Sequence, residues 1–169
     1  MTEEWFDLVS PDGDIIGRAL RSECHGNPDL LHQAIHVFVI HPETGDLFLQ
    51  QRSTQKDIQP GKWDTSVGGH VDSGERPEQA VVRELREELG VEAGEPEYLY
   101  RYQWQSPVES ELIRSYRLYH AGPFTLQPEE LDDGRFWSRE EIESTLGTSV
   151  FTPNFESEWP RIRDYVQAQ

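Results

Sequence analysis

The stretch that decides the fold is "GGHVDSGERPEQAVVRELREELGV", residues 68–91. It joins a glycine-rich loop to the segment "PEQAVVRELREEL", which a proline opens and a glycine follows, as is typical of helix boundaries. Apolar residues recur in this segment at helical spacing. We therefore predict a helix over residues 77–89, with Val81, Leu85 and Leu89 facing the core.

Three glutamates share another face of this predicted helix. Glu84, Glu87 and Glu88 stand at positions i, i+3 and i+4, so their carboxylates lie side by side. A solvated acidic surface is the ordinary explanation for such a run of charge. Three carboxylates within two turns also fit a hard divalent cation, Mg²⁺ or Mn²⁺, which takes oxygen ligands. The helix alone leaves both interpretations open.

The letters around the helix resemble the signature of the Nudix superfamily, G-x5-E-x7-R-E-U-x-E-E-x-G-U, where U is aliphatic. The residues that match it are Gly69, Glu75, Arg83, Glu84, Leu85, Glu87, Glu88, Gly90 and Val91. The resemblance implies an α/β fold, specifically an α/β/α sandwich with a mixed sheet. It also implies a loop–helix–loop metal-binding motif over residues 69–91, within a single Nudix domain that spans residues 1–169.

The same resemblance implies a chemistry and a role for each residue of the motif. A Nudix-like enzyme uses Mg²⁺ or Mn²⁺ to hydrolyse a diphosphate linked to another group, X. The three helical glutamates are the expected metal ligands, and the backbone of Gly68 is expected to add a further contact, since glycine lets the chain approach a ligand closely. Arg83 is expected to pair with Glu75 and hold the loop. Which glutamate acts as general base is left open.

A closer resemblance extends beyond the motif. The segments "ECHGNPDLLHQAIHVFVI" and "LFLQQRSTQKDIQPGKWDTSVGGH" resemble type I isopentenyl-diphosphate isomerase and the hydrolases related to it. This resemblance implies a second metal site for a transition metal, Mn²⁺ or Zn²⁺. Each matching residue alone is more simply explained as a surface or packing residue. The five matching residues are His25, His32, His70, Glu109 and Glu111.

Three further positions bear on the activity. Arg52 and Lys56 match residues that hold the diphosphate in the isomerase, although a surface role for both stays open. Gly68 stands where the isomerase carries its catalytic cysteine, and glycine has no side chain that transfers a proton. An isomerase-like enzyme is therefore disfavoured. A module that binds metal or nucleotide without turnover is the other alternative to a pyrophosphohydrolase.

The charge composition of the chain limits the kinds of molecule that it can bind. The chain has 32 acidic and 15 basic residues, a formal charge of −17, so it lacks the basic surface that nucleic-acid binding requires. We expect a small diphosphate substrate, and a nucleotide-containing one because such substrates are common in the superfamily that the chain resembles. The acidic N-terminal sequence, the lack of a membrane-spanning apolar run and a lone cysteine predict a cytoplasmic protein with no membrane partner, as a monomer or homodimer.

Alternating and apolar patterns predict the remaining elements. We expect strands near residues 4–9, 15–21, 32–40, 47–52, 96–104 and 111–122, and a strand followed by a helix over 135–146. Residues 53–69 carry turn signals throughout and predict a long loop. A C-terminal helix is expected at about 153–167. The aromatic residues that alternate over 98–104 are expected to pack against that helix rather than stack on a base.

Overall fold

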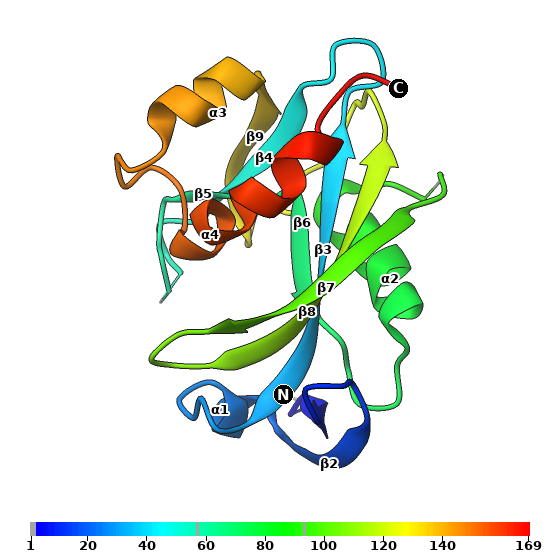
Figure 1. Cartoon of the computed structure of the whole chain (residues 1–169), viewed down its shortest axis with the longest axis vertical. Coiled ribbons are helices and arrows are strands. Elements are labelled where there is room, and N and C mark those ends of the chain that lie inside the picture. Colours follow the sequence, from blue (N-terminus) through cyan, green and yellow to red (C-terminus); the bar gives the residue numbers. More distant parts are fainter. Residues whose placement is uncertain (1–2, 57, 93) are drawn as a thin grey trace.

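The computed structural model describes residues 3–56, 58–92 and 94–169, which form one nine-stranded mixed sheet with helices on both faces (Figure 1). This arrangement confirms the predicted α/β class and sandwich. The strands are β1 (Trp5–Val9), β2 (Ile15–Leu20), β3 (Leu31–Ile40), β4 (Leu47–Arg52), β5 (Trp63–Asp64), β6 (Val67–His70), β7 (Glu97–Gln105), β8 (Ser110–Tyr119) and β9 (Leu131–Trp137). The helices are α1 (Arg21–Cys24), α2 (Pro77–Leu89), α3 (Arg139–Thr145) and α4 (Pro153–Ile162).

Strand β3 lies at the centre of the sheet. It pairs in parallel with β8 over its whole length and antiparallel with β6 on its other side, where His36 stands opposite Gly68. Strand β7 extends this sheet beyond β8, while β4 carries β5 and β9. Every residue of β3 after Leu31 is buried, because helices cover both of its faces. Strand β3 can therefore carry side chains to two separate cores.

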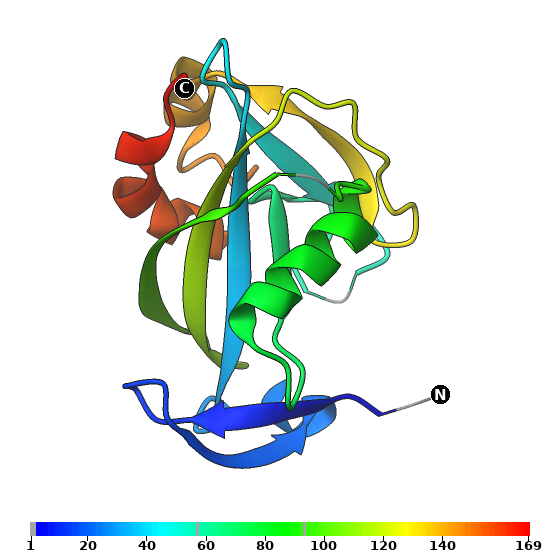
Figure 2. The same cartoon turned by 90° about the vertical axis from the view of Figure 1, so that its right-hand side faces the viewer.

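Alternation along β3 divides the interior into two layers. Ile35, Val37 and Val39 pack with the apolar face of α2, which includes the predicted core residues Val81, Leu85 and Leu89. Phe38 and Ile40 point the other way, into a core shared with α3 and α4. Figure 2 shows α2 against one side of the sheet and the C-terminal helices against the other. His36 belongs to the second set, so its side chain faces α4.

Local sequence explains where α2 begins and ends. Pro77 occupies its first turn, and the Gln79 side chain accepts a hydrogen bond from the N–H of Arg76 at 2.9 Å. Gly90 closes the helix in the left-handed region, at φ 68°, and its N–H donates to the carbonyl of Arg86. The predicted helix over 77–89 is therefore confirmed at both ends. The loop and the helix together place the glutamates beside β6.

Two predicted boundaries were wrong. The expected loop over residues 53–69 contains β5 and most of β6. Although β6 is short and contains two glycines, it pairs with the central strand β3. The C-terminal helix ends at Ile162 and continues as a 3₁₀ turn, Arg163–Tyr165, so it stops short of residue 167. Pro160 lies inside α4.

The predicted packing of the β7 aromatics is partly correct. Tyr100 and Tyr102 reach α4, where their hydroxyls bond to Glu158. A register shift between Tyr98 and Tyr100 breaks the alternation, so Tyr98 is half exposed and lies against Tyr116 instead.

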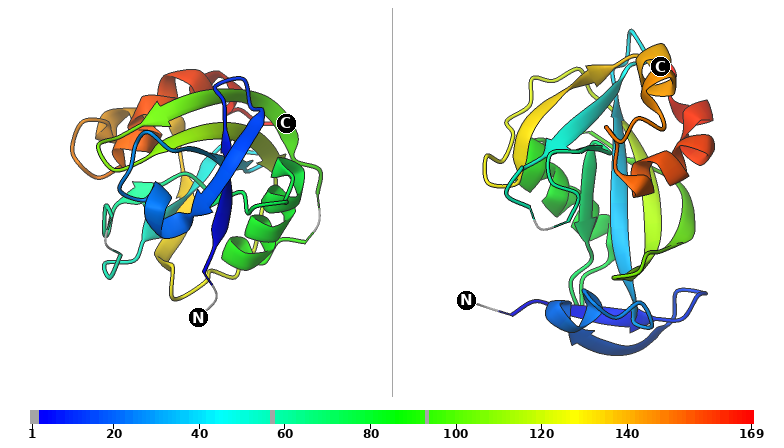
Figure 3. Two further views of the ribbon diagram at one scale, coloured as in Figure 1. Left: turned by 90° about the horizontal axis from the view of Figure 1, so that it is seen from below. Right: turned by 90° about the vertical axis from the view of Figure 1, so that its left-hand side faces the viewer.

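The first two strands form a hairpin at one end of the molecule. Strand β1 pairs with β2 and makes a single bridge to β3, through Leu8 and His32. Figure 3 shows this hairpin and α1 crossing the end of β3, away from α3 and α4. The hairpin thereby encloses the first residues of β3. No helix in the described ranges is long and apolar enough to cross a membrane.

Candidate active site and metal centres

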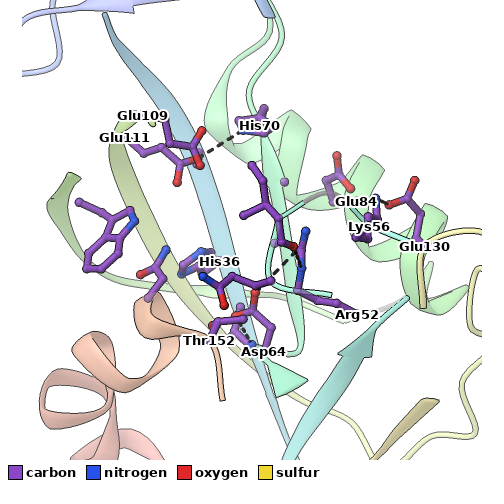
Figure 4. A pocket seen from close by; sticks show the side chains of 18 of the residues that line it. His36, Arg52, Lys56, Asp64, His70, Glu84, Glu109, Glu111, Glu130 and Thr152 are labelled. Atoms are coloured by element: carbon purple, nitrogen blue, oxygen red, sulfur yellow. Dashed lines mark hydrogen bonds and ion pairs between the residues drawn. The ribbon is translucent and has the colours of Figure 1, made fainter. Parts of the chain in front are cut away.

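An open pocket of about 1130 Å³ lies where β3, β6, α2 and the β7–β8 hairpin meet. Three groups of polar side chains line it, and Figure 4 shows representatives of each. Glu84 marks the helical glutamates, His70 with Glu109 and Glu111 marks the histidine–glutamate cluster, and His36 with Thr152 marks a wall near α4. All the sequence-predicted site residues except His32 and Glu75 line this one pocket.

The helical glutamates differ in exposure. Glu87 is about half exposed, whereas Glu84 and Glu88 point inward along β6. Gly69 allows this approach, because a Cβ at that position would collide with the Glu84 carboxylate. Glu88 accepts one hydrogen bond, from the N–H of Gly68 at 3.2 Å. The glycine pair of the loop therefore lets two carboxylates lie directly against the backbone.

The surroundings of Glu84 and Glu88 disfavour their ionised forms. Burial raises the pKa of Glu88 well above its usual value, and the neighbouring charge of Glu84 raises it further. Burial also raises the pKa of Glu84, against the opposing effect of Arg83. A divalent cation between these carboxylates would stabilise their ionised forms, and carboxylate oxygens are the ligands that Mg²⁺ and Mn²⁺ prefer. The donor set therefore fits such a metal.

Arg83 connects the loop to the helix. Its Nε and Nη2 each lie 2.9 Å from an oxygen of Glu75, a two-pronged geometry that suits a guanidinium and a carboxylate. Nη2 also donates to the carbonyl of His70 at 3.0 Å, and Nη1 to Glu84 at 2.7 Å. The hydrogen bonds to Arg83 lower the pKa of Glu75 although burial opposes this. Arg83 thus fixes the loop and one helical carboxylate at once.

The second group gathers from four separate parts of the chain. His25 follows α1, His32 begins β3, His70 ends β6, and Glu109 and Glu111 stand where β8 begins. One ligand atom from each of the three histidines and Glu109 lies within 4.8 Å of the others. Glu111 Oε2 lies 3.3 Å from His70 Nε2 and 3.9 Å from His32 Nε2. The structure therefore brings all five predicted residues together.

The donor atoms of this cluster fit a metal ion. The Nε2 atom of His25 lies 3.4 Å from that of His70 and 3.3 Å from Glu109 Oε2. Ligands about 2.1 Å from a tetrahedral centre would stand roughly 3.4 Å apart. Two buried atoms, His32 Nε2 and Glu109 Oε2, have no hydrogen-bond partner within the described residues. Buried polar atoms without partners are rare, and a shared metal ion would satisfy both.

The cluster shifts the pKa values of its members in different directions. Burial lowers the pKa of His32, but the nearby carboxylates of Glu109 and Glu111 outweigh it and raise that pKa. Burial opposes ionisation of Glu111, but the hydrogen bond and charge of His70 outweigh it and lower the pKa of Glu111 to about 2. Burial and the proximity of His70 lower the pKa of His25. A neutral imidazole and an ionised carboxylate are the forms that bind transition metals. Histidine with carboxylate ligands favours Zn²⁺ or Mn²⁺ over Ca²⁺.

The two predicted diphosphate-binding bases also reach the pocket. Arg52 ends β4, donates to the carbonyl of Ile58 at 3.0 Å, and has its Nη1 3.9 Å from Asp64 Oδ2. Lys56 pairs with Glu130 (Figure 4). Both partners are carboxylates that line the same pocket as the glutamates of α2.

Sequence reasoning missed a buried histidine–glutamate pair beside this pocket. His36 lines the pocket, and its Nδ1 lies 2.7 Å from Oε1 of Glu158 on α4. The predicted strand contained His36. Its alternation with Phe38 and Ile40, which share one face of the strand, was the only pattern that indicated a position facing α4. Glu158 gave a weaker signal, because exposed glutamates are common on helices. Thr152 and Asn154 at the start of α4 were also missed as pocket residues.

Comparisons with known proteins agree with the geometry. A family model described as NUDIX domain matches residues 30–155. An uncharacterized Nudix hydrolase of Yersinia pestis is 36% identical over 155 residues, which cover 89% of this chain and 81% of the relative. Isopentenyl-diphosphate Delta-isomerase 1 of Photorhabdus laumondii is 29% identical over 163 residues, 92% of each chain. A crystal structure from Deinococcus radiodurans has a TM-score of 0.81 at 26% identity, covering 94% of this chain and 98% of that one.

Proposed function

The chain belongs to the Nudix family, and from this premise we propose that it is a pyrophosphohydrolase that uses Mg²⁺ or Mn²⁺ to cleave a diphosphate linkage in a small, nucleotide-containing molecule. The observation that carries the proposal is Glu88. The residue is 9% exposed, and its carboxylate accepts one backbone hydrogen bond beside a second inward carboxylate, Glu84. Burial and the neighbouring charge of Glu84 disfavour the ionised form of Glu88, and a bound cation would favour it.

In this proposal the chain's residues divide the work. Glu84, Glu87 and Glu88 hold the cation, together with the backbone of Gly68. When bound, the cation neutralises diphosphate oxygens and lowers the pKa of water. The pocket is otherwise strongly acidic, so a diphosphate needs that cation to enter. Arg52 and Lys56 bind the remaining oxygens and orient the diphosphate.

Arg83 and Glu75 act as positioning residues. Arg83 holds Glu84 and the His70 carbonyl in place, so the loop of residues 69–76 keeps its shape when charge accumulates in the pocket. General-base catalysis requires a carboxylate within hydrogen-bond reach of the attacking water. Glu84, Glu87 and Glu88 are the candidates for that role.

We further propose that the histidine–glutamate cluster holds a second metal, Zn²⁺ or Mn²⁺. The unpartnered buried atoms of His32 and Glu109 support this site. Metal analysis of protein purified without added metal tests it. We expect about one equivalent of transition metal in the wild type and little in His32→Ala. Metal-free wild-type protein, with unchanged thermal stability in the variant, would remove the second site from the proposal.

Isomerase chemistry is the second candidate, because one relative carries that name. Gly68 argues against it. A Cβ there would meet the His36 ring at 3.4 Å, an ordinary contact, so the position has room for a side chain that this sequence does not supply. Cys24 does not replace it, since it is buried beneath the N-terminal hairpin with Phe6 and Ala19.

A panel of diphosphates tests the proposed function. It contains nucleoside di- and triphosphates, ADP-ribose, sugar nucleotides, dinucleotides and isopentenyl diphosphate, each with Mg²⁺ or Mn²⁺. We expect release of phosphate or mononucleotide from at least one class, and its loss in Glu88→Gln. Isomerised isopentenyl diphosphate would support the second candidate. Ligand binding without any product would indicate a module that binds metal or nucleotide without turnover.

A further inference from the structure

We propose that His36, Thr152 and Asn154 form the subsite for the X group, and that X is a polar group rich in hydrogen-bonding atoms, such as a sugar or a nucleobase, rather than a hydrocarbon chain. All three residues line the pocket. They are separate from the metal-ligand sets described above. In Figure 4, His36 and Thr152 lie on one side of the pocket and Glu84 on another. The inference rests on the proposed function and names the class of its substrate.

Glu158 is the anchor of this wall. It is 1% exposed, and its carboxylate contacts four groups from three strands. Oε2 accepts from Tyr100 at 2.7 Å and from Ser115 at 2.5 Å, and Oε1 lies 2.6 Å from the Tyr102 hydroxyl and 2.7 Å from His36 Nδ1. A buried carboxylate with this many donors is fully satisfied and rigid. It therefore holds its partners in one arrangement.

The contact with Glu158 fixes the orientation of His36. The carboxylate is an acceptor only, so the ring donates through Nδ1 in either protonation state. Its Nε2 is directed to the opposite edge of the ring, toward Gly68 and the pocket. None of the described residues makes a hydrogen bond to that atom. A polar atom held at a pocket wall without a protein partner is available to a ligand.

The start of α4 supplies the other two polar groups. The Asn154 side chain lies 3.0 Å from the Tyr102 hydroxyl, which connects it to Glu158. The Thr152 hydroxyl accepts from the N–H of Phe155 as the helix cap, which leaves its own proton free to donate. One buried carboxylate thus orders two members of the wall, and the helix cap orders the third.

The chemistry of this wall selects against an apolar X. A hydrocarbon chain would cover the imidazole, amide and hydroxyl without bonding to them, and each buried polar group left without a partner weakens binding. A site built to bond a polar ligand rejects an analogue that lacks the matching groups. Sugar hydroxyls and nucleobase edges offer both donors and acceptors, so they match the imidazole, amide and hydroxyl together.

Binding and turnover by matched ligands test this subsite. The probes share a diphosphate and differ in X: ADP-ribose and UDP-glucose are polar, isopentenyl diphosphate is apolar, and methyl diphosphate has almost no X. Binding is measured by calorimetry with Ca²⁺, and kcat and KM are measured with Mg²⁺ or Mn²⁺. His36→Asn keeps a donor for Glu158 but removes Nε2, and Asn154→Ala removes the amide. Trp159→Phe, buried in the same helix and outside the pocket lining, controls for loss of stability.

We expect a polar probe to bind the wild type at least ten times more tightly than isopentenyl diphosphate. Each subsite variant should weaken that polar probe about tenfold in Kd and KM, and leave methyl diphosphate unchanged. The control should bind every probe like the wild type. Equal affinity for the polar and apolar probes would overturn the inference, as would variants that weaken all probes alike.

The design separates this inference from the proposed function. Selective binding of a polar probe without hydrolysis would leave the subsite standing and contradict the pyrophosphohydrolase. Hydrolysis that proceeds equally well with isopentenyl and nucleotide diphosphates would leave the pyrophosphohydrolase standing and contradict the subsite. Failure to bind any diphosphate in the presence of metal would overturn both.

Discussion

Glu88 and Glu158 are the same residue type, each on a helix and each buried, yet their surroundings are opposite. Glu158 is 1% exposed and contacts four donors from the protein. Glu88 is 9% exposed and accepts one N–H at 3.2 Å. The charge of His36 lowers the pKa of Glu158 in spite of burial, whereas burial and Glu84 raise the pKa of Glu88.

This difference separates a carboxylate that the protein satisfies from one that we propose binds a cation. The protein itself satisfies the charge of Glu158, so that residue contributes to the fold and to the shape of the pocket wall. Glu88 has been buried beside another carboxylate without compensation, which costs stability unless a ligand supplies positive charge. Burial alone therefore does not identify a site. Burial with a single hydrogen bond, beside like charge, is the observation that supports the proposed site.

The largest contrast is expected in catalysis. Glu88→Gln removes a charge that the cation needs, and we expect kcat/KM to fall on the order of 10³-fold, or about 4 kcal/mol of transition-state stabilisation. Its midpoint of thermal unfolding without metal should stay the same or rise, because an uncompensated buried charge has been removed. Steady-state kinetics and calorimetry measure both. Near wild-type turnover would contradict the role of Glu88.

The second contrast is in stability. Glu158→Gln keeps the shape of the side chain but removes the charge that four donors share, and we expect it to lower the free energy of unfolding by about 3 kcal/mol at pH 7. Urea unfolding measures this. A variant as stable as the wild type would show that the network contributes nothing to the fold.

The stabilisation that Glu158 provides is expected to depend on pH. The pKa of Glu158 is lower in the folded protein than its usual 4.5, so its contribution to stability is fully present above that pH. It is lost as the pH falls through the folded pKa, because the unfolded chain takes up the proton first. The difference in unfolding free energy between wild type and Glu158→Gln should therefore shrink below about pH 4.5. A difference that grows with acid would reverse the sign of the argument.

The smallest effect is expected at Glu75, which acts through Arg83. Glu75→Gln keeps one acceptor for the guanidinium and weakens the loop, so we expect metal affinity and kcat/KM to fall about 10- to 100-fold, as for residues that orient metal ligands. Its effect should be smaller than that of Glu88→Gln. A larger loss would mean that Glu75 itself contacts the metal or the substrate.

The sequence predicted the local part of this molecule well. Helix α2 follows from its apolar spacing and its proline and glycine boundaries, so helical periodicity alone places its three glutamates on one face. The histidine–glutamate cluster came from resemblance rather than from spacing, because His32 and Glu111 meet only through the pairing of β3 with β8. Strand β6 was missed because two of its four residues are glycines, which disfavour strands in isolation.

The Glu158 network could not be predicted for a related reason. Its members come from β3, β7, β8 and α4, and no local pattern connects them. The bulge in β7 also decides which tyrosines face α4, and a bulge is a property of the paired strands. Long-range register therefore determines the pocket wall, whereas helix periodicity determines the face of α2 that carries the three glutamates.

The central claim is that α2 holds a divalent cation through Glu88. Titration of Mn²⁺ followed by electron paramagnetic resonance tests it most directly, in a His32→Ala background that removes the histidine–glutamate cluster. We expect the His32→Ala protein to bind one Mn²⁺, and the addition of Glu158→Gln to leave that affinity unchanged. The addition of Glu88→Gln should weaken Mn²⁺ binding at least tenfold. Equal Mn²⁺ affinity with and without the Glu88 carboxylate would contradict the account.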